Sequence, residues 1–209
     1  MGFKTIAMAC VLLLSDAAQA ITQVACLGDS ITLTASSRAT KPYPHQLEHQ
    51  LNALYPGEYA VANYGTGAHR SDQNLTTWTN NIRGRGFDVL VLLTGINDIV
   101  QDVSAATAWG NINTIVDEAK SDGLTVVLIT VMPFGSYTSW TVGRQAVLDT
   151  LLTSIRAETG LTVLDLYPSW ETSAGSDILL ASYDVGDGLH PGETGTTALA
   201  TAVRGALGL

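Results

Sequence analysis

Val89-Leu90-Val91-Leu92-Leu93 is the stretch of sequence that decides the fold, because every one of its side chains is apolar. A strand with one solvated face alternates apolar and polar residues, whereas a parallel strand covered on both faces is apolar throughout. The stretch also has the length of a single strand and is followed by Thr94-Gly95. We therefore predict a buried strand over residues 87–94, inside a parallel sheet with helices on both faces.

The rest of the chain alternates in the same way between short apolar runs and longer amphipathic segments. Runs rich in Val, Leu, Ile and Thr predict further strands over residues 23–27, 58–63, 125–131 and 161–165. Apolar side chains at helical spacing predict helices over residues 43–54, 71–83, 104–121, 141–159 and 192–207. This alternation predicts a single-domain α/β/α sandwich with a five-stranded parallel sheet and right-handed crossovers.

The composition indicates a globular protein and argues against nucleic acid as a partner. The 209 residues fit one domain, and 46% of them are hydrophobic while 14% are charged, a balance typical of a packed core. The formal net charge is -9, and the chain contains no basic run. Because binding to a phosphate backbone needs clustered Lys and Arg, the sequence predicts no nucleic-acid partner.

The first twenty residues have the features of a signal peptide. Lys4 supplies a positive charge, residues 6–14 form a short apolar run, and Ala18-Gln19-Ala20 has the small residues of a cleavage site. The apolar run is too short to span a bilayer. We expect cleavage after Ala20, a secreted domain over residues 21–209 and no stable membrane association. The alternative is a buried amphipathic first helix.

The chain contains two cysteines and a glycosylation sequon, and secretion would affect both features. Cleavage would remove Cys10 and leave Cys26, so we expect no internal disulfide. Cys26 lies in an apolar run, which indicates a small core residue rather than a nucleophile. Asn74-Leu75-Thr76 is a sequon that only a eukaryotic secretory pathway would use.

Four short motifs lie after predicted strands. They are Gly28-Asp29-Ser30-Ile31-Thr32, Asn63-Tyr64-Gly65-Thr66-Gly67, Gly95-Ile96-Asn97-Asp98 and Asp187-Gly188-Leu189-His190-Pro191. A parallel sheet places the carboxyl ends of its strands at one edge, and ligands of such folds bind beyond that edge. We therefore expect the four motifs to meet there, although they are spread over most of the chain.

The first and last motifs together contain a serine, a histidine and a carboxylate. Serine is a weak nucleophile unless a base within hydrogen-bond reach is itself oriented by a third group. His190 is the best candidate base, because Asp187, three residues earlier, can fold back onto the imidazole and fix its tautomer. Each motif alone has a plain alternative, in which Ser30 caps the next segment and His190 is a surface ring. Together they predict Ser30, Asp187 and His190 as catalytic residues.

The two middle motifs offer hydrogen-bond donors for an oxyanion, which acyl transfer requires. For this role we predict the backbone N–H groups of Ser30 and Gly67 and the side chain of Asn97. The alternative interpretation makes Asn97 an Asx-turn residue and Gly67 a left-handed turn position.

In order and spacing, the four motifs resemble the conserved blocks of the SGNH subgroup of GDSL-type esterases and lipases. The resemblance covers essentially the whole mature chain and implies a flavodoxin-like SGNH hydrolase fold that needs no cofactor. It implies Ser30 as the nucleophile, His190 as the base and later the acid, and Asp187 as the residue that orients His190. Asn97 and the backbone of Ser30 would line the oxyanion hole.

The chain departs from the family pattern at two positions. The family often has glycine where this chain has Thr34, and its oxyanion glycine often falls at the position of Ala68. A backbone donor tolerates alanine, so the oxyanion hole can survive this change. Between Ala68 and its neighbour, we take Gly67 as the backbone donor.

These observations predict a secreted serine esterase that hydrolyses carboxylic esters through an acyl-enzyme. The chain has no obvious lid insertion, which favours short-chain acyl or acetyl esters, and the resemblance adds acetylated polysaccharides as substrates. One alternative is a non-catalytic carbohydrate-binding module on the same fold, and another is a lipase or phospholipase acting on longer acyl chains. We expect a monomer whose partner is a small-molecule or polysaccharide ester.

Residues beside the motifs are candidates for substrate contact. They are Asp29, His69, Arg70 and Tyr137. For Arg70 the alternative is a surface salt bridge. Tyr137, Trp140 and Trp170 follow predicted strands, where aromatic side chains either form a rim around a site or pack in the core.

His45-Gln46-Leu47-Glu48-His49 matches the H-x-x-E-H pattern of inverted zinc peptidases, with both imidazoles on one helical face. The pattern is short, the sequence offers no convincing third ligand, and the predicted helix lies away from the strand ends. We interpret the segment as a solvated helix face and expect no metal. A metallopeptidase is the alternative.

Overall fold

The computed structural model describes residues 20–33 and 41–209. The expected signal peptide lies outside these residues apart from Ala20, which is exposed. Cys10 and Thr34 also lie outside the described part of the chain.

Five parallel strands form one sheet in the order β2-β1-β3-β4-β5, which confirms the predicted fold class. The strands are β1 (Thr22–Gly28), β2 (Tyr59–Gly65), β3 (Val89–Leu93), β4 (Thr125–Ile129) and β5 (Thr162–Leu164). β3 lies at the centre between β1 and β4, and all of its side chains are buried. Its continuous apolar run is therefore explained by cover on both faces.

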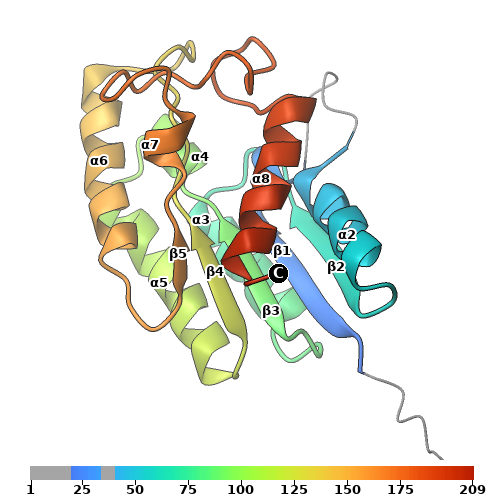
Figure 1. Ribbon diagram of the computed structural model, residues 1–209. Helices are drawn as coiled ribbons and strands as arrows, with labels where there is room; N and C mark the ends of the chain where they lie inside the picture. The colour runs from blue at the N-terminus through green and yellow to red at the C-terminus, as the bar shows by residue number, and fades with distance from the viewer. Residues whose placement is uncertain (1–19, 34–40) are drawn as a thin grey trace, which may run out of the picture.

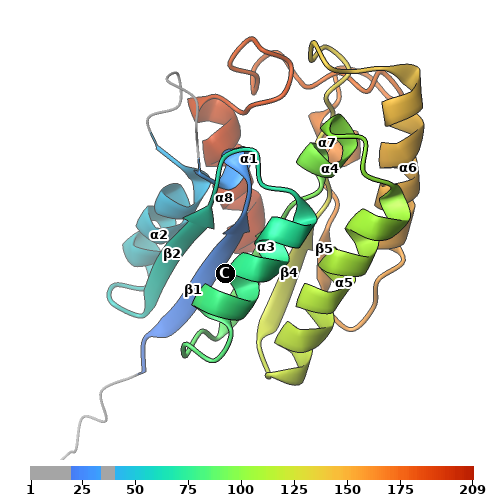
Figure 2. The same ribbon diagram turned by 180° about the vertical axis from the view of Figure 1, so that it is seen from behind.

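Helices cover both faces of the sheet, as predicted (Figures 1 and 2). α2 (Tyr43–Leu54) and α8 (Glu193–Ala206) pack against each other on one face. On the other face α5 (Ala105–Ser121) lies between α3 (Ser71–Thr77) and α6 (Val142–Arg156). Each crossover thus places its helix as a right-handed connection requires.

The structure departs from the predicted elements at short segments. The predicted helix over 71–83 ends as α3 and continues as a π-helical turn, η1 (Trp78–Ile82). Three helices of four or five residues were not predicted: α1 (Ser30–Leu33), α4 (Ile96–Val100) and α7 (Tyr167–Trp170). One helical turn is too short to show an apolar period, so its sequence carries no such signal.

Two buried side chains, Cys26 in β1 and Asn74 in α3, bear on two questions raised by the sequence: the role of the cysteine and the accessibility of the glycosylation sequon. Cys26 is fully buried in β1, and burial raises the pKa of its thiol to about 12 despite a hydrogen bond with Tyr43. It is a core residue, as predicted. Asn74 is also fully buried and donates from its amide to Thr94 Oγ1 at 2.7 Å. A glycan therefore has no access to the sequon in the folded protein.

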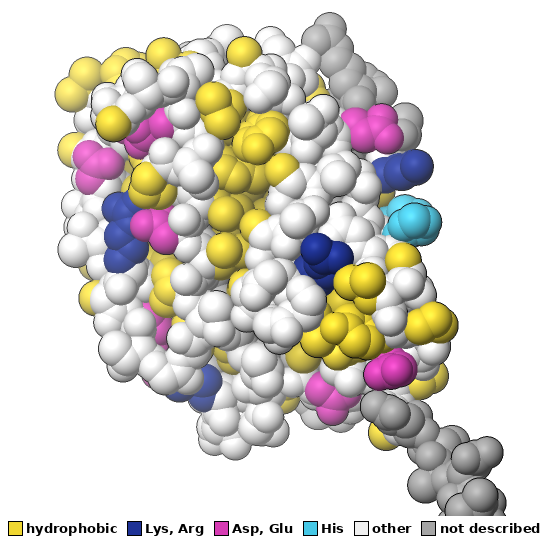
Figure 3. Space-filling view, viewed as in Figure 1, with side chains coloured by type: hydrophobic (Ala, Val, Ile, Leu, Met, Phe, Trp, Pro, Cys, Tyr) yellow, Lys and Arg dark blue, Asp and Glu magenta, His cyan; other side chains and the backbone are white. Residues whose placement is uncertain are grey.

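The surface agrees with the acidic composition. On the face shown in Figure 3, Lys and Arg side chains are scattered singly among Asp and Glu, without a basic patch. Within residues 20–33 and 41–209, no helix is both long enough and apolar enough to cross a membrane.

Two glycines let α1 lie over the ends of β1 and β2. Gly28 of β1 pairs with Gly65 of β2 and with Leu93 of β3. A Cβ at Gly28 would overlap the carbonyl oxygen of Leu93 and the hydroxyl of Thr32, and one at Gly65 would overlap the backbone of Leu33. Only glycine leaves room for the turn that leads from β1 into α1.

We predict that Gly28→Ala lowers the free energy of unfolding by at least about 2 kcal/mol, because the added methyl group meets backbone that cannot move away. Gly110→Ala is the matched control: Gly110 lies inside α5 with open space around its Cβ position. Alanine there should stabilise by about 0.5–1 kcal/mol through helix propensity. Denaturant unfolding measures both values, and a Gly28→Ala variant as stable as wild type would contradict the packing argument.

Candidate active site

The structure brings the four motifs together at the carboxyl ends of the strands. Ser30 begins α1 directly after β1, and residues 66–70 form the loop between β2 and α3. Asn97 lies in α4, which follows β3. His190 lies in the last loop before α8. In Figure 1 this edge of the sheet is at the top of the molecule, under the loops.

Ser30, His190 and Asp187 form a continuous hydrogen-bonded chain. Ser30 Oγ lies 2.9 Å from His190 Nε2, across 160 residues of sequence. His190 Nδ1 lies 2.7 Å from Asp187 Oδ2. Both distances are those of strong hydrogen bonds, and the order of the groups is that of nucleophile, base and orienting carboxylate.

Asp187 is held as a carboxylate by its own loop. Its Oδ1 accepts the backbone N–H groups of Leu189 and His190, both at 2.9 Å, while Oδ2 faces the imidazole. Partial burial works against the charged form, but the hydrogen bonds from His190 and Leu189 outweigh it and hold the pKa of Asp187 below its usual value. The carboxylate therefore stays ionised at neutral pH, and an ionised acceptor keeps the proton of His190 on Nδ1.

Asn97 points its amide toward the loop after β2. Its Nδ2 donates to the carbonyl oxygen of His69 at 3.1 Å. A side-chain amide has two N–H groups, so one is used for this contact and one remains for a ligand. In that loop, the backbone N–H groups of Gly67 and Ala68 donate to no other described residue. This is consistent with the predicted role of an N–H group of this turn as an oxyanion donor, which stays a prediction.

The backbone conformation separates Gly67 from Ala68. Ala68 has a φ of +61°, in the left-handed region that favours glycine, whereas Gly67 is not in that region. The position that needs glycine is therefore Ala68, where the family often has one. Our choice of Gly67 as the donor stays a prediction, since both N–H groups are in the same turn.

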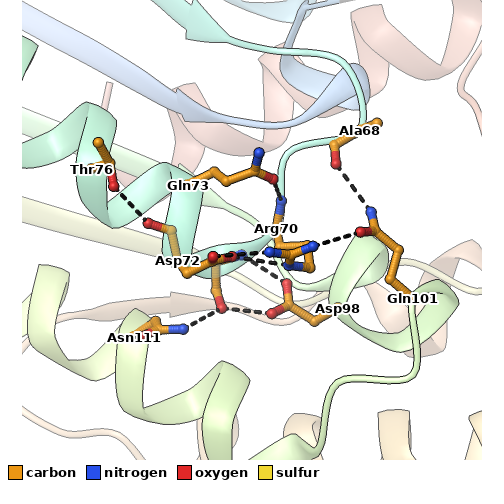
Figure 4. A network of polar contacts seen from close by, with 9 residues as sticks. Ala68, Arg70, Asp72, Gln73, Thr76, Asp98, Gln101 and Asn111 are labelled. Atoms are coloured by element: carbon orange, nitrogen blue, oxygen red, sulfur yellow. Dashed lines mark hydrogen bonds and ion pairs between the residues drawn. The ribbon is translucent and has the colours of Figure 1, made fainter.

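A network of polar side chains anchors this loop to α4 (Figure 4). Gln101 donates to the carbonyl oxygen of Ala68 at 3.2 Å and accepts from Arg70 at 2.8 Å. Arg70 also forms a two-point contact with Asp72, with both distances 3.0 Å. The guanidinium is thus engaged with the protein itself, which matches the salt-bridge alternative for Arg70 and gives it a role in holding the turn.

Asp98, next to Asn97, holds the start of α3. Its carboxylate accepts the backbone N–H of Ser71 at 2.8 Å and the Ser71 hydroxyl at 2.6 Å. Asn111 in turn donates to that hydroxyl at 3.0 Å. Burial raises the pKa of Asp98, and the bonds from Ser71 oppose the rise. The sequence analysis gave Asp98 no role, because its burial is visible only in the structure.

Asp29 lies beneath the site rather than in it. The side chain is fully buried, and its Oδ1 accepts the backbone N–H of Ile31 at 2.9 Å. Burial raises the pKa of Asp29 to about 7, although the Ile31 bond and the nearby His190 favour the charged form. A carboxyl group with no exposed surface has none to offer a substrate, so the predicted contact is replaced by a role in shaping the turn at Ser30.

The remaining candidates lie around the site in different environments. His69 and Tyr137 are both half-buried, at the loops after β2 and β4. Trp170 is buried and stacks at a tilt on Tyr183, with ring centroids 4.8 Å apart. The Trp140 indole donates to Gln145 at 3.1 Å. Of the predicted aromatic rim, Tyr137 has surface available and Trp170 belongs to the core.

In the H-x-x-E-H segment of α2, His45 and His49 are exposed on the outer face. Glu48 faces inward to β2, where its Oε1 accepts the backbone N–H of Val61 at 3.2 Å. Among the described residues, no group of three or more His, Cys, Asp or Glu is placed to hold a metal ion.

The raised pKa of Asp29 predicts a pH dependence of stability. The folded protein keeps this proton up to about pH 7, whereas the unfolded chain releases it near the ordinary value of 3.8. Between these values the folded state binds more protons, so rising pH favours unfolding. Asp29→Asn replaces the titrating carboxyl group with an amide, which still has an oxygen that can accept the backbone N–H of Ile31. Its stability relative to wild type should therefore rise from pH 4 to pH 7 by up to about 1.4 kcal/mol per pH unit and then level off. Parallel unfolding free energies of the two proteins over this range would refute the assignment.

Three solved structures that share the fold have less than 25% sequence identity with this chain. A GDSL-like lipase from Bacteroides thetaiotaomicron has 17% identity and a TM-score of 0.70, with 90% of this chain and 88% of that chain covered. The lipase/acylhydrolase from Enterococcus faecalis has 23% identity and a TM-score of 0.71, with 90% and 96% covered. A catalytic mutant of Axe2, an acetylxylan esterase from Geobacillus stearothermophilus, has 18% identity and a TM-score of 0.72, with 91% and 96% covered.

At these identities the structures establish the shared fold, and no curated protein matches the sequence. The model of one protein family matches residues 26–198, which include all four motifs. The chain therefore belongs to the GDSL-like Lipase/Acylhydrolase family.

Proposed function

We propose that this protein is a serine esterase that hydrolyses carboxylic esters of short acyl groups, acetyl esters above all. The observation that carries the proposal is the hydrogen-bonded chain from Ser30 Oγ through His190 to Asp187, with distances of 2.9 and 2.7 Å. Membership of an acylhydrolase family supports ester hydrolysis in general.

In the proposed first half-reaction, Ser30 Oγ attacks the ester carbonyl carbon and gives its proton to His190 Nε2. The bond from Asp187 keeps the other proton on Nδ1, so Nε2 is the free acceptor. The carbonyl oxygen becomes an oxyanion that accepts from the Asn97 amide and from backbone N–H groups of Ser30 and Gly67. The tetrahedral species collapses as His190 returns the proton to the leaving alcohol, which leaves an acyl group on Ser30.

The second half-reaction repeats these steps with water. His190 takes a proton from the water as it attacks the acyl carbon, and a second oxyanion forms in the same place. Collapse breaks the bond to Ser30 Oγ, which recovers its proton from His190, and the acid leaves. Every proton that moves is carried by the imidazole, so no cofactor is needed.

The preference for short acyl groups rests on the compact chain and on one structural relative. The described chain carries no insertion that would serve as a lid over the site. Axe2, which shares the fold, is an acetylxylan esterase. We therefore propose acetylated polysaccharides as natural substrates. We also propose that the protein is secreted and acts as a monomer. A lipase acting on longer acyl chains is the competing proposal, since a GDSL-like lipase also shares the fold.

We expect Ser30→Ala to reduce the rate of p-nitrophenyl acetate hydrolysis by at least about 1,000-fold with little change in stability, because it removes only the nucleophile. Ser121→Ala, at the exposed end of α5, is the matched control and should keep wild-type activity. Equal activity in Ser30→Ala and wild type would rule out the serine mechanism. Loss of activity with chelators, but not in Ser30→Ala, would favour the metallopeptidase.

Acyl preference is tested with p-nitrophenyl esters of two to sixteen carbons, measured beside acetate release from acetylated xylan. We expect kcat/KM to be highest for the shortest chains and to fall by about tenfold or more at long chains, because a long acyl chain that no pocket accommodates hinders the placement of the ester carbonyl beside Ser30. A maximum at long chains would establish the lipase instead. Binding of acetylated xylan without any acetate release would identify the carbohydrate-binding module.

A further inference from the structure

Asp184 organises the loop that carries His190, although it lies outside all four motifs. Its Oδ1 accepts the backbone N–H groups of three consecutive residues: Gly186 at 2.8 Å, Asp187 at 3.1 Å and Gly188 at 3.1 Å. Its Oδ2 also lies 3.1 Å from the N–H of Gly188. One carboxylate thus fixes the direction of three successive peptide units that lead to the catalytic pair.

The catalytic carboxylate continues the same pattern. The next two backbone N–H groups, those of Leu189 and His190, both donate to Asp187 Oδ1 at 2.9 Å. All five N–H groups from residue 186 to residue 190 are therefore directed at two carboxylates. Asp184 sets the backbone of Asp187, and Asp187 sets the backbone and the ring of His190.

The conformation of this loop is one that a chain adopts only with support. Gly186 has a φ of +101° and Gly188 a φ of +80°, both in the region that L side chains avoid. The N–H of Val185 donates to the carbonyl oxygen of His190 at 3.0 Å, and Asp184 pairs with Pro191, so the loop closes on itself. Glycine allows many backbone conformations, so the two glycines at the centre of this closed loop do not fix its shape. The shape is therefore determined by the groups that accept the N–H bonds of the loop.

We propose that Asp184 is a positioning residue for catalysis: its contacts with three consecutive N–H groups hold Asp187 and His190 at the distance from Ser30 that proton transfer needs. Asp184 contacts neither Ser30 nor the imidazole in this role, and it acts through the backbone of the loop. The inference rests on the proposed esterase function. A displacement of about 1 Å in a catalytic group can cost about 100-fold in rate, so a modest relaxation of this loop has a large effect.

Acceptor geometry and charge are separated by two substitutions. Asp184→Asn removes the charge but keeps an Oδ1 in the same place, so three of the four contacts survive. Asp184→Glu keeps the charge but moves the carboxylate one CH₂ further from the backbone. Asp184→Ala removes every acceptor. Asp88→Ala is the control. Asp88 Oδ2 likewise accepts a backbone N–H, that of Gln23 at 2.8 Å, but it lies where β1 and β3 begin, at the opposite end of these strands from the site.

The experiment measures kcat and KM for p-nitrophenyl acetate, the rate of Ser30 labelling by a fluorophosphonate, and the thermal unfolding midpoint. We expect Asp184→Ala and Asp184→Glu to lower kcat and the labelling rate by about 10- to 100-fold with KM changed little, because proton transfer and not substrate binding is disturbed. Asp184→Asn should stay within about fivefold of wild type, and Asp88→Ala should match wild type.

Full activity of Asp184→Glu, or equal impairment of Asp184→Asn and Asp184→Glu, would overturn the proposal, and so would activity losses that only follow the loss of folded protein. The comparison of Asp184→Asn with Asp184→Glu tests the proposal by itself, so the test holds even if Asp184→Ala does not fold. An inactive wild type would instead count against the esterase function, which keeps the two failures distinct.

Discussion

The parallel register of β1 between β2 and β3 is the constraint on which the rest of the structure depends. Gly28 stands opposite both Gly65 and Leu93, so three strands end at the same level. Each is followed within a few residues by a predicted site group: Ser30, the loop at residues 66–68, and Asn97. A shift of one strand by one residue would turn its side chains to the opposite face and separate these groups. Packing in the core determines the register of the strands, and the register determines where the site residues lie relative to one another.

Most of the fold was predictable because it depends on long apolar patterns. The run over β3 and the helical spacing of α5 and α6 are strong signals, and the elements they predict are present. The predicted catalytic side chains also lie within hydrogen-bond distance of each other, since parallel strand ends must converge. What the sequence could not supply is any feature set by a single turn: α1, α4 and the left-handed backbone of Ala68 leave no periodic trace.

Roles that depend on burial were equally hidden from the sequence. Asp29 and Asp187 are both acidic residues of a recognisable motif, yet the first has a pKa raised by burial and the second a pKa lowered by the hydrogen bonds of its loop. Asp184 belongs to no motif, and its three N–H contacts exist only because the chain turns back on itself. Whether an aspartate is a base, an orienting group or a structural acceptor is decided by its surroundings.

The separation of 160 residues between Ser30 and His190 has a consequence for the protein's synthesis. Ser30 and His190 meet because α2, which follows Ser30, packs on α8, which follows His190. Gln46 and Gln50 of α2 donate to Thr196 and Thr201 of α8 across this pair. During synthesis Ser30 is therefore made 160 residues before His190, and the hydrogen bond between them can form only after that stretch has been translated. A chain that ends before residue 190 has Ser30 without the imidazole, so the proposed esterase activity requires translation through this loop.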